Sequence, residues 1–315
     1  MRVVALSGGV GGAKLSLGLY RALPAHALTV IVNTGDDFEH LGLRICPDLD
    51  TTLYTLAGIE HPAQGWGRRD ETWTFLRVIA DLGDEAWFRL GDGDVALHVL
   101  RTQRLQAGER LSQVMQDFAQ RLGIAARIVP MSDVPVATRV VTDEGELAFQ
   151  EYFVRRRCEP RVRAIHFDGA ADAKPAAEAI AALEAPDLAA VVLCPSNPFL
   201  SIDPLLAIPG IRRALVARRA PVVAVSPLIG GRAVKGPTAK IMDELGVATT
   251  PRAIAGRYRG LIDGLVIDAQ DSVLAGELDI EVFSTRTLMQ TLDDRVALAR
   301  FVLDCAARVR VRAPT

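Results

Sequence analysis

Short hydrophobic runs bounded by glycine, proline or polar residues recur along the chain, and apolar residues at helical spacing fill most intervals between them. Such runs predict buried strands, and the 3.6-residue period predicts helices. Their alternation predicts an α/β fold, a Rossmann-like three-layer arrangement with a parallel sheet. The predicted core strands are residues 3–6, 28–32, 127–130, 188–193, 221–225, 261–267 and 278–283.

The alternation stops between residues 59 and 124, where helical spacing prevails. After a loop at 59–69, helices are predicted at 71–82, after Asp92 as a cap, and at 111–122. We therefore predict an inserted, mainly helical subdomain or lid at 59–124. The nucleotide-binding core is then formed by residues 1–58 and 125–315.

The second part of the core opens with a predicted hairpin near 138–154, with strands at 138–142 and 146–154. The basic run at 155–157 is interpreted as a solvated edge, with a patch beside an anionic ligand as the alternative. A further strand is predicted at 163–167. Helices are predicted at 176–183, 204–206, 211–218, 238–245 and 289–309.

Composition narrows the class of protein. Half of the 315 residues are hydrophobic, enough for a substantial core, and the net charge of −2 argues against nucleic acid as a partner. The four cysteines show no metal-ligand or C-x-x-C spacing, and the chain opens on a strand pattern rather than a signal peptide. No apolar run approaches the ~18 residues of a membrane helix. We expect a cytoplasmic protein without a membrane partner.

Candidate chemistry begins with the stretch at 7–14, SGGVGGAK, between the first strand and the first helix. Glycines allow a ligand to approach backbone N–H groups closely, and a helix start favours an anion. We interpret Gly8, Gly9, Gly11 and Gly12 as a phosphate cradle to which Lys14 adds a charge. A plain tight turn is the alternative.

This stretch differs from two known phosphate-binding loops. A P-loop needs Ser or Thr directly after its lysine, and Leu15 stands there, so that match fails. A dinucleotide fingerprint needs a third glycine, where Lys14 stands, and an acid at the end of the second strand, where Asn33 stands. A nicotinamide-binding site is therefore weakened but stays open.

Two further loops follow predicted strands, whose carboxyl ends share one edge of a parallel sheet. Ser196 and Asn197 follow strand 188–193, and a glycine-rich loop with Gly230, Gly231 and Lys235 follows strand 221–225. Both are candidates for nucleotide and phosphate binding. Proline- and glycine-bounded turns are the alternative.

Carboxylates follow the second strand in the polar stretch at 34–50. Asp36, Asp37 and Asp50 fall near the same edge as the glycine loop, and hard carboxylate oxygens suit Mg²⁺. Turn formation by Asp36 and Asp37 and helix capping by Asp50 are the alternatives. Backbone N–H groups, lysine and arginine side chains and carboxylates together favour phosphoryl-type transfer, which needs alignment of the substrates and neutralisation of charge.

Several of these stretches occur together in one known family. The chain resembles the 2-phospho-L-lactate transferase family (CofD/FbiA type) of coenzyme F-420 biosynthesis, and the pairing of NTGDD with ICPDLDT is the most specific part. The matching stretches are SGGVGGAK (7–14), VNTGDDFEHLGLRICPDLDTTLYTLAG (32–58), RRDETW (68–73), WFRLGDGD (87–94), PSNP (195–198) and SPLIGGRAVKGP (226–237).

The resemblance implies an activity. A guanosine diphosphate ester of phospholactate, phosphoenolpyruvate or phosphoglycerate would donate its organophosphate to the terminal ribityl hydroxyl of the deazaflavin Fo. GMP would leave, with Mg²⁺ as cofactor, and the protein would be a homodimer. The resemblance further implies that Asp50 and Arg89 contact Fo, and that Asp36 and Asp50 are metal ligands. The nucleotide and its phosphates would lie along Gly8–Gly12, Ser196, Asn197 and Gly230–Lys235.

Asp50 is the predicted catalytic residue. A carboxylate is a weak base for an alcohol, so metal ligation and positioning are favoured over proton abstraction. A nicotinamide-dependent oxidoreductase and a non-catalytic nucleotide-binding regulator are the alternative functions. The intact ICPDLDT segment argues against the regulator, because a sensor needs no acceptor site.

Overall fold

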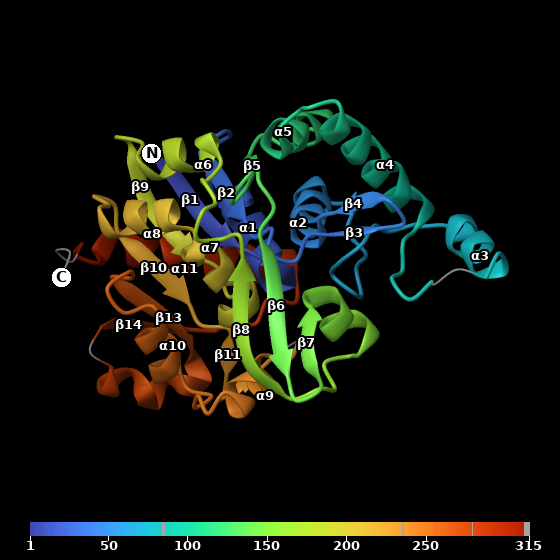
Figure 1. Ribbon diagram of the computed structural model, residues 1–315. Helices are drawn as coiled ribbons and strands as arrows, with labels where there is room; N and C mark the ends of the chain where they lie inside the picture. The colour runs from blue at the N-terminus through green and yellow to red at the C-terminus, as the bar shows by residue number, and fades with distance from the viewer. Residues whose placement is uncertain (84–85, 235, 279, 312–315) are drawn as a thin grey trace.

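The computed structural model describes residues 1–83, 86–234, 236–278 and 280–311. Within these residues, seven parallel strands form the central sheet (Figure 1). Their order across the sheet is β5 (Arg127–Pro130), β2 (Leu28–Val32), β1 (Arg2–Ser7), β9 (Leu188–Leu193), β10 (Val222–Val225), β13 (Gly264–Asp268) and β14 (Glu281–Thr285). The predicted α/β fold is confirmed, and the last strand begins three residues later than expected.

The strand order places a switch point between β1 and β9. From β1 the chain proceeds to β2 and β5 on one side, then returns to β9 and continues outward on the other. This is the doubly wound order in which ligands bind outside the carboxyl ends of the strands at the point of reversal. The glycine loop follows β1 and the Ser196–Asn197 turn follows β9.

Helices cover both faces of the sheet, and alternate residues of β1 divide between the two cores. Val3 and Ala5 belong to one buried cluster, and Val4 and Leu6 belong to the other. The first cluster includes α1 (Gly9–Ala22), α2 (Pro47–Ala57), α5 (Leu111–Arg121) and α11 (Leu292–Arg308). The second includes α6 (Ala177–Leu183), α7 (Asp203–Ala207), α8 (Pro209–Val216), α9 (Thr238–Glu244) and α10 (Pro251–Arg257).

Two helices of the predicted insertion form an arm that extends from this body. Figure 1 shows α4 (Asp92–Gln106) leading outward and α3 (Thr74–Asp81) at the outer end. No residue of α3 is buried, whereas α5 buries Leu111, Val114 and Phe118 in the sheet core. The segment 59–124 therefore contains both an arm and a helix that covers the sheet, a distinction that helical spacing did not reveal.

The arm is held by caps exchanged between its two helices. Asp92 accepts hydrogen bonds from the backbone N–H groups of Thr74 and Phe75 at 3.2 and 2.9 Å. Glu71 accepts from Gly93 and Asp94 at 2.7 and 3.0 Å. The prediction that Asp92 caps its own helix was wrong: Asp92 is the first helical residue, where its side chain reaches the neighbouring helix instead.

A smaller antiparallel sheet lies beside the core, in the order β7 (Gly145–Ala148), β6 (Ala137–Thr142), β8 (Val162–Asp168). The predicted strand 146–154 was too long, because η1, a π-helix, occupies Glu151–Arg155. Phe149 stacks on Phe153 with ring centroids 5.2 Å apart, and Tyr152 is buried. Aromatic residues spaced three and four apart suit one helical face rather than an alternating strand.

The remaining short elements border the carboxyl edge of the central sheet. They are the hairpins β3 (Phe38–His40) with β4 (Leu43–Ile45) and β11 (Leu228–Ile229) with β12 (Arg232–Ala233), and the turns η2 (Pro198–Ile202) and η3 (Ala269–Glu277). The first hairpin lies inside the stretch 34–50, which we predicted only as a polar segment leaving the sheet. Among the described residues, none of the helices has the length and hydropathy needed to span a bilayer.

Candidate active site

A cavity of about 790 Å³ opens at the switch point of the sheet. The glycine loop, the start of α2 and the turn after β9 line it from the core. The arm contributes residues 87–90, Asp94 and His98, and the segment that runs from the hairpin after β10 to the start of α9 contributes Ile229, Val234 and Thr238. The cavity therefore joins the three strand-end segments predicted from sequence to the arm.

The glycine loop packs directly on the turn after β9. The Gly8 N–H donates to Ser196 Oγ at 3.4 Å, and Gly9 adopts φ of +61°. A Cβ added at Gly11 would lie 2.3 Å from the backbone oxygen of Pro195. Gly12 does not line the cavity, and a Cβ there would lie 2.4 Å from Ser7 Oγ. Gly8, Gly9 and Gly11 thus face the cavity, while Gly12 serves close packing.

The side chain of Asp48, a residue of α2 that the sequence analysis did not single out, contacts the start of the glycine loop. Its carboxylate accepts from the Gly9 N–H at 2.8 Å and from Asn33 Nδ2 at 3.0 Å. Burial raises the pKa of Asp48 to about 6. An acid at the amino end of α1 is stabilised by the helix dipole, and it occupies one of the N–H groups predicted to bind phosphate.

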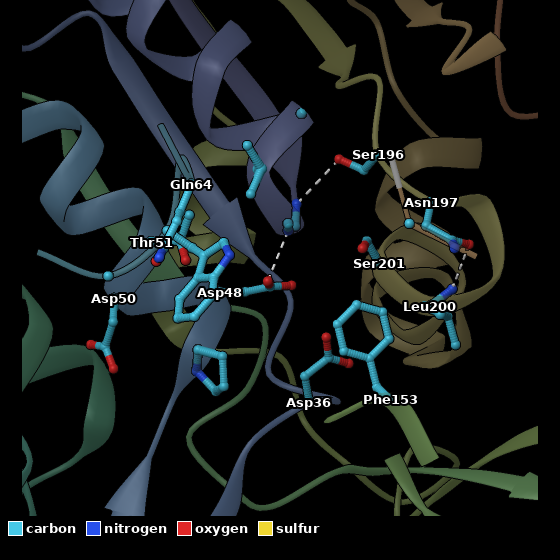
Figure 2. A pocket seen from close by; sticks show the side chains of 18 of the residues that line it. Asp36, Asp48, Asp50, Thr51, Gln64, Phe153, Ser196, Asn197, Leu200 and Ser201 are labelled. Atoms are coloured by element: carbon cyan, nitrogen blue, oxygen red, sulfur yellow. Dashed lines mark hydrogen bonds between the residues drawn. The ribbon is translucent and has the colours of Figure 1, made fainter. Parts of the chain in front are cut away.

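Asp36 lies beside Asp48, and Figure 2 shows both carboxylates facing the same space across from Ser196 and Ser201. Burial and the negative charge of Asp48 raise the pKa of Asp36 well above its usual range. Asp36 Oδ1 is buried and has no hydrogen-bond partner within the described parts of the chain. Two buried carboxylates, one with an unsatisfied oxygen, suit a cation between them.

Asp50 has a different partner. Both of its oxygens accept from the guanidinium group of Arg101, Oδ2 at 3.1 Å from Nη1 and Oδ1 at close range from Nη2. Asp50 also lines the cavity. The structure thus brings Asp48, rather than the predicted Asp50, next to Asp36, and in Figure 2 the Asp50 side chain lies away from that pair.

The second glycine-rich loop is arranged differently from the prediction. The N–H groups of Gly230 and Gly231 donate to the carboxylate of Asp271 at 3.1 and 2.9 Å, and neither glycine lines the cavity. Their prediction as phosphate-binding residues does not fit this geometry, because an internal carboxylate already takes both donors. Lys235 lies outside the described residues.

The other predicted phosphate contacts line the cavity but have structural partners too. Lys14 Nζ donates to the backbone oxygen of Met289 at 2.9 Å. Asn197 accepts from the N–H groups of Phe199 and Leu200 at 3.0 and 3.2 Å, which caps η2 and leaves its amide NH₂ to donate to a ligand.

The arm side of the cavity is aromatic. Trp87 and Phe88 line it and pack in edge-on geometry against His40 and Phe38, with ring centroids 5.4 and 4.8 Å apart. Arg89, predicted to contact Fo, also lines the cavity, and its guanidinium lies 4.6 Å from the ring centroid of Trp73. This wall offers flat apolar surface beside a cation.

The prediction missed Asp48, Arg101 and His98 for two different reasons. Pro47 is the first residue of α2, a position that proline favours, so the helix begins three residues before Asp50. That start places Asp48 in the first turn beside the glycine loop, and the proline was the signal that could have located it. Arg101 and His98 lie on the far side of the insertion, and no local pattern connects them to Asp50.

The doubly wound sheet, the glycine loop at its switch point and the acidic pair make this an α/β protein whose cavity suits a phosphate-bearing ligand. Comparison with known proteins identifies the family of this chain. A family model described as 2-phospho-L-lactate transferase CofD matches residues 3–291, and the chain belongs to this family.

Two named relatives match nearly the full length of the chain. It is 42% identical to the phosphoenolpyruvate transferase of Streptomyces griseus, over 98% of this chain and 100% of the relative, and 43% identical to that of Kitasatospora aureofaciens, over 98% and 99%. A UPF0052 family structure from Bacillus halodurans shares the fold, with a TM-score of 0.62, 15% identity, and coverage of 96% of this chain and 98% of that one. The chain is therefore an enzyme, a transferase of a family of coenzyme F-420 biosynthesis, as predicted.

Proposed function

We propose that this enzyme transfers a phosphoenolpyruvyl group from its guanosine diphosphate ester to the terminal ribityl hydroxyl of Fo. The hydroxyl oxygen bonds to the phosphorus that carries the enol ester. The bond from that phosphorus to the bridging oxygen breaks, GMP leaves with the electron pair, and the hydroxyl proton is released. The choice of phosphoenolpyruvate over phospholactate and phosphoglycerate rests on the names of the relatives.

The observation that carries the proposal is the junction of glycine loop, acidic pair and aromatic wall in one cavity. The N-terminus of α1, with Ser196 and the Asn197 amide, suits the diphosphate of the donor. Asp48 would repel that diphosphate unless a cation lay between them. The loop and the acidic pair are therefore most compatible as parts of a single metal–diphosphate site.

Asp36 and Asp48 fit a magnesium ion. Mg²⁺ takes one or two carboxylates together with substrate phosphates and waters rather than a closed protein cage. That preference agrees with the absence of any cluster of three or more potential ligands in the described residues, and with the unsatisfied Oδ1 of Asp36. When bound, the ion would supply charge neutralisation on the diphosphate.

Asp50 and Arg89 are proposed to contact the acceptor. Asp50 lines the cavity on the arm side, where Trp87 and Phe88 offer the flat surface that a deazaflavin ring requires. Because Arg101 engages both oxygens of Asp50, we assign Asp50 to accepting a hydrogen bond from the ribityl chain rather than to the metal.

The test is a competition experiment. Purified enzyme is incubated with Fo, Mg²⁺ and the guanosine diphosphate esters of the three acids, and products are identified by mass. We expect one dominant phosphoenolpyruvyl adduct with equimolar GMP. A dominant phospholactyl or phosphoglyceryl adduct refutes the donor, and the absence of any adduct refutes the transfer.

The metal assignment is tested separately by binding. Mg²⁺ with GDP should raise the melting temperature of the wild type, and NAD(H) should not, whereas an oxidoreductase would respond to NAD(H). Asp36→Asn should abolish the magnesium-dependent part of the shift. Asp70→Asn is the matched control, since the Asp70 side chain is 93% exposed outside the cavity. Equal shifts in both variants refute the role of Asp36.

A further inference from the structure

Arg101 is the largest side chain that is fully buried in the described residues, and it does not line the cavity. It projects from α4 of the arm and meets Asp50 on α2 of the core. The contact is two-pronged: the two terminal nitrogens, Nη1 and Nη2, donate to different oxygens of the carboxylate. Such fork-to-fork pairing fixes the plane of the carboxylate as well as its distance.

Further contacts hold the guanidinium itself in place. Nη1 donates to the backbone oxygen of Arg44 at 3.3 Å, lies 3.2 Å from His98 Nδ1, and Nη2 lies 3.8 Å from the sulfur of Met115. These groups belong to β4, α4 and α5. Arg101 is therefore anchored from three elements before it reaches Asp50, and the arm and the core together determine the orientation of that carboxylate.

A purely structural explanation is weaker. Burying an ion pair is seldom more stabilising than packing apolar side chains in its place, so the pair is not explained by stability alone. The carboxylate of Asp50 faces the cavity, whereas the carboxylate of Asp263, which pairs with the buried Arg218, does not line it. A carboxylate fixed at its back by arginine presents its remaining lone pairs in a set direction toward the cavity.

We infer that Arg101 is a positioning residue for the transfer: it acts through Asp50, orienting that carboxylate to align the acceptor hydroxyl. The inference rests on the proposed function. It predicts that Arg101 affects acceptor alignment and leaves the donor site largely unchanged, because the glycine loop and the Asp36–Asp48 pair do not contact it.

The experiment is a double-mutant cycle on the full-length enzyme with Fo and the donor ester. Arg101→Met should lower kcat/KM for Fo by about 100-fold, the effect expected of a misplaced reacting group. GDP–Mg²⁺ binding should change by less than about threefold, within ordinary independence of separate sites. Arg101→Lys should recover part of the loss, since lysine restores charge but not the fork.

The decisive comparison uses Asp50→Asn. If Arg101 acts through Asp50, adding Arg101→Met to Asp50→Asn should cost less than about a further threefold. Losses that multiply would overturn the inference, as would equal weakening of Fo and GDP binding by Arg101→Met. Arg104→Met is the matched control on the same helix, because Arg104 pairs with Glu109 and Asp117 outside the cavity and should leave activity unchanged.

Folding does not obscure the outcome. Either single variant leaves one charge of the pair buried without its partner, so each is first checked for folding by circular dichroism. If Arg101→Met or Asp50→Asn fails to fold, Arg101→Lys, which keeps both charges but not the fork, decides the test: it should lower kcat/KM for Fo and leave GDP–Mg²⁺ binding within about threefold, and equal weakening of both overturns the inference. A wild type that forms no adduct refutes the proposed function and this inference with it. An active wild type with multiplicative losses refutes the inference alone.

Discussion

The packing of the glycine loop on the turn after β9 makes a quantitative prediction for Gly11→Ala. Gly11 lies in the first turn of α1, where its missing side chain lets the helix approach the backbone of Pro195. An added Cβ would lie 2.3 Å from the Pro195 oxygen, whereas carbon and oxygen normally approach only to about 3.3 Å. Neither neighbour is a flexible side-chain end that could move aside.

Two opposing terms determine the stability change. Alanine is favoured over glycine inside a helix by about 1 kcal/mol. Overpacking a rigid contact costs about 1–3 kcal/mol. This case lies at the upper end of that range, because the added methyl group meets backbone atoms that cannot rotate away. The net loss is therefore about 2 kcal/mol. Gly256→Ala in α10 is the matched control, because a Cβ there meets nothing within 4 Å and only the gain of up to about 1 kcal/mol remains.

Thermal unfolding monitored by circular dichroism tests the pair. An unfolding entropy of about 2.1 cal/mol/K per residue makes 1 kcal/mol worth about 1.5 °C for 315 residues. We expect Gly11→Ala to melt about 3 °C below the wild type and Gly256→Ala up to about 1.5 °C above it. If Gly11→Ala melts at or above the wild-type temperature, the close approach of α1 to Pro195 is refuted.

Three further predictions concern features outside the donor site. Asp263→Asn should cost about 3–5 kcal/mol in urea unfolding with unchanged KM, because Arg218 would stay buried without its charge partner; an altered KM with full stability would contradict this. Burial raises the pKa of Asp94 to about 6, so the folded protein binds an extra proton and this stabilisation is lost as pH rises from about 4 to 7. The melting temperature of Asp94→Asn relative to wild type should therefore rise over that range, and a constant difference would count against it. Asp92→Ala should raise the rate of amide hydrogen exchange in α3, because a lost cap costs about 1 kcal/mol. An unchanged rate would show that the caps between α3 and α4 do not hold the arm.

The fold was predictable because hydrophobic period is a local property. Residues 188–193 are apolar throughout, and this pattern alone predicts a strand buried on both faces, whichever strands lie beside it. The same reasoning failed at 146–154, where aromatic residues three and four apart were interpreted as a strand although they share one face of the helical segment 149–155. Short apolar segments carry too few residues to separate the two periods.

The candidate site was predictable only where its members follow strands. The glycine loop and Ser196 meet because parallel strands end at one edge, which the topology alone dictates. Gly230 and Gly231 satisfied the same rule, yet a carboxylate from η3, Asp271, takes their N–H groups. A glycine pair whose N–H groups are free to bind a ligand looks the same in sequence as a pair whose N–H groups bond to a carboxylate of the protein. Only the tertiary structure distinguishes the two cases.

The division of the cavity between the core and the arm agrees with the proposed transfer between two bound substrates. The proposed donor end is built from core segments that pack tightly, as the near contact of Gly11 with Pro195 illustrates. The proposed acceptor end takes Trp87, Phe88 and Arg89 from the link between the two arm helices, and the arm reaches the core carboxylate Asp50 through Arg101. Transfer between two bound substrates requires that the attacking hydroxyl be aligned with the phosphorus only when both are present. The proposed donor site in the core and the proposed acceptor site at the arm–core junction would meet that requirement, because a displacement of α4 would alter the orientation of Asp50 while the glycine loop and the Asp36–Asp48 pair keep their contacts.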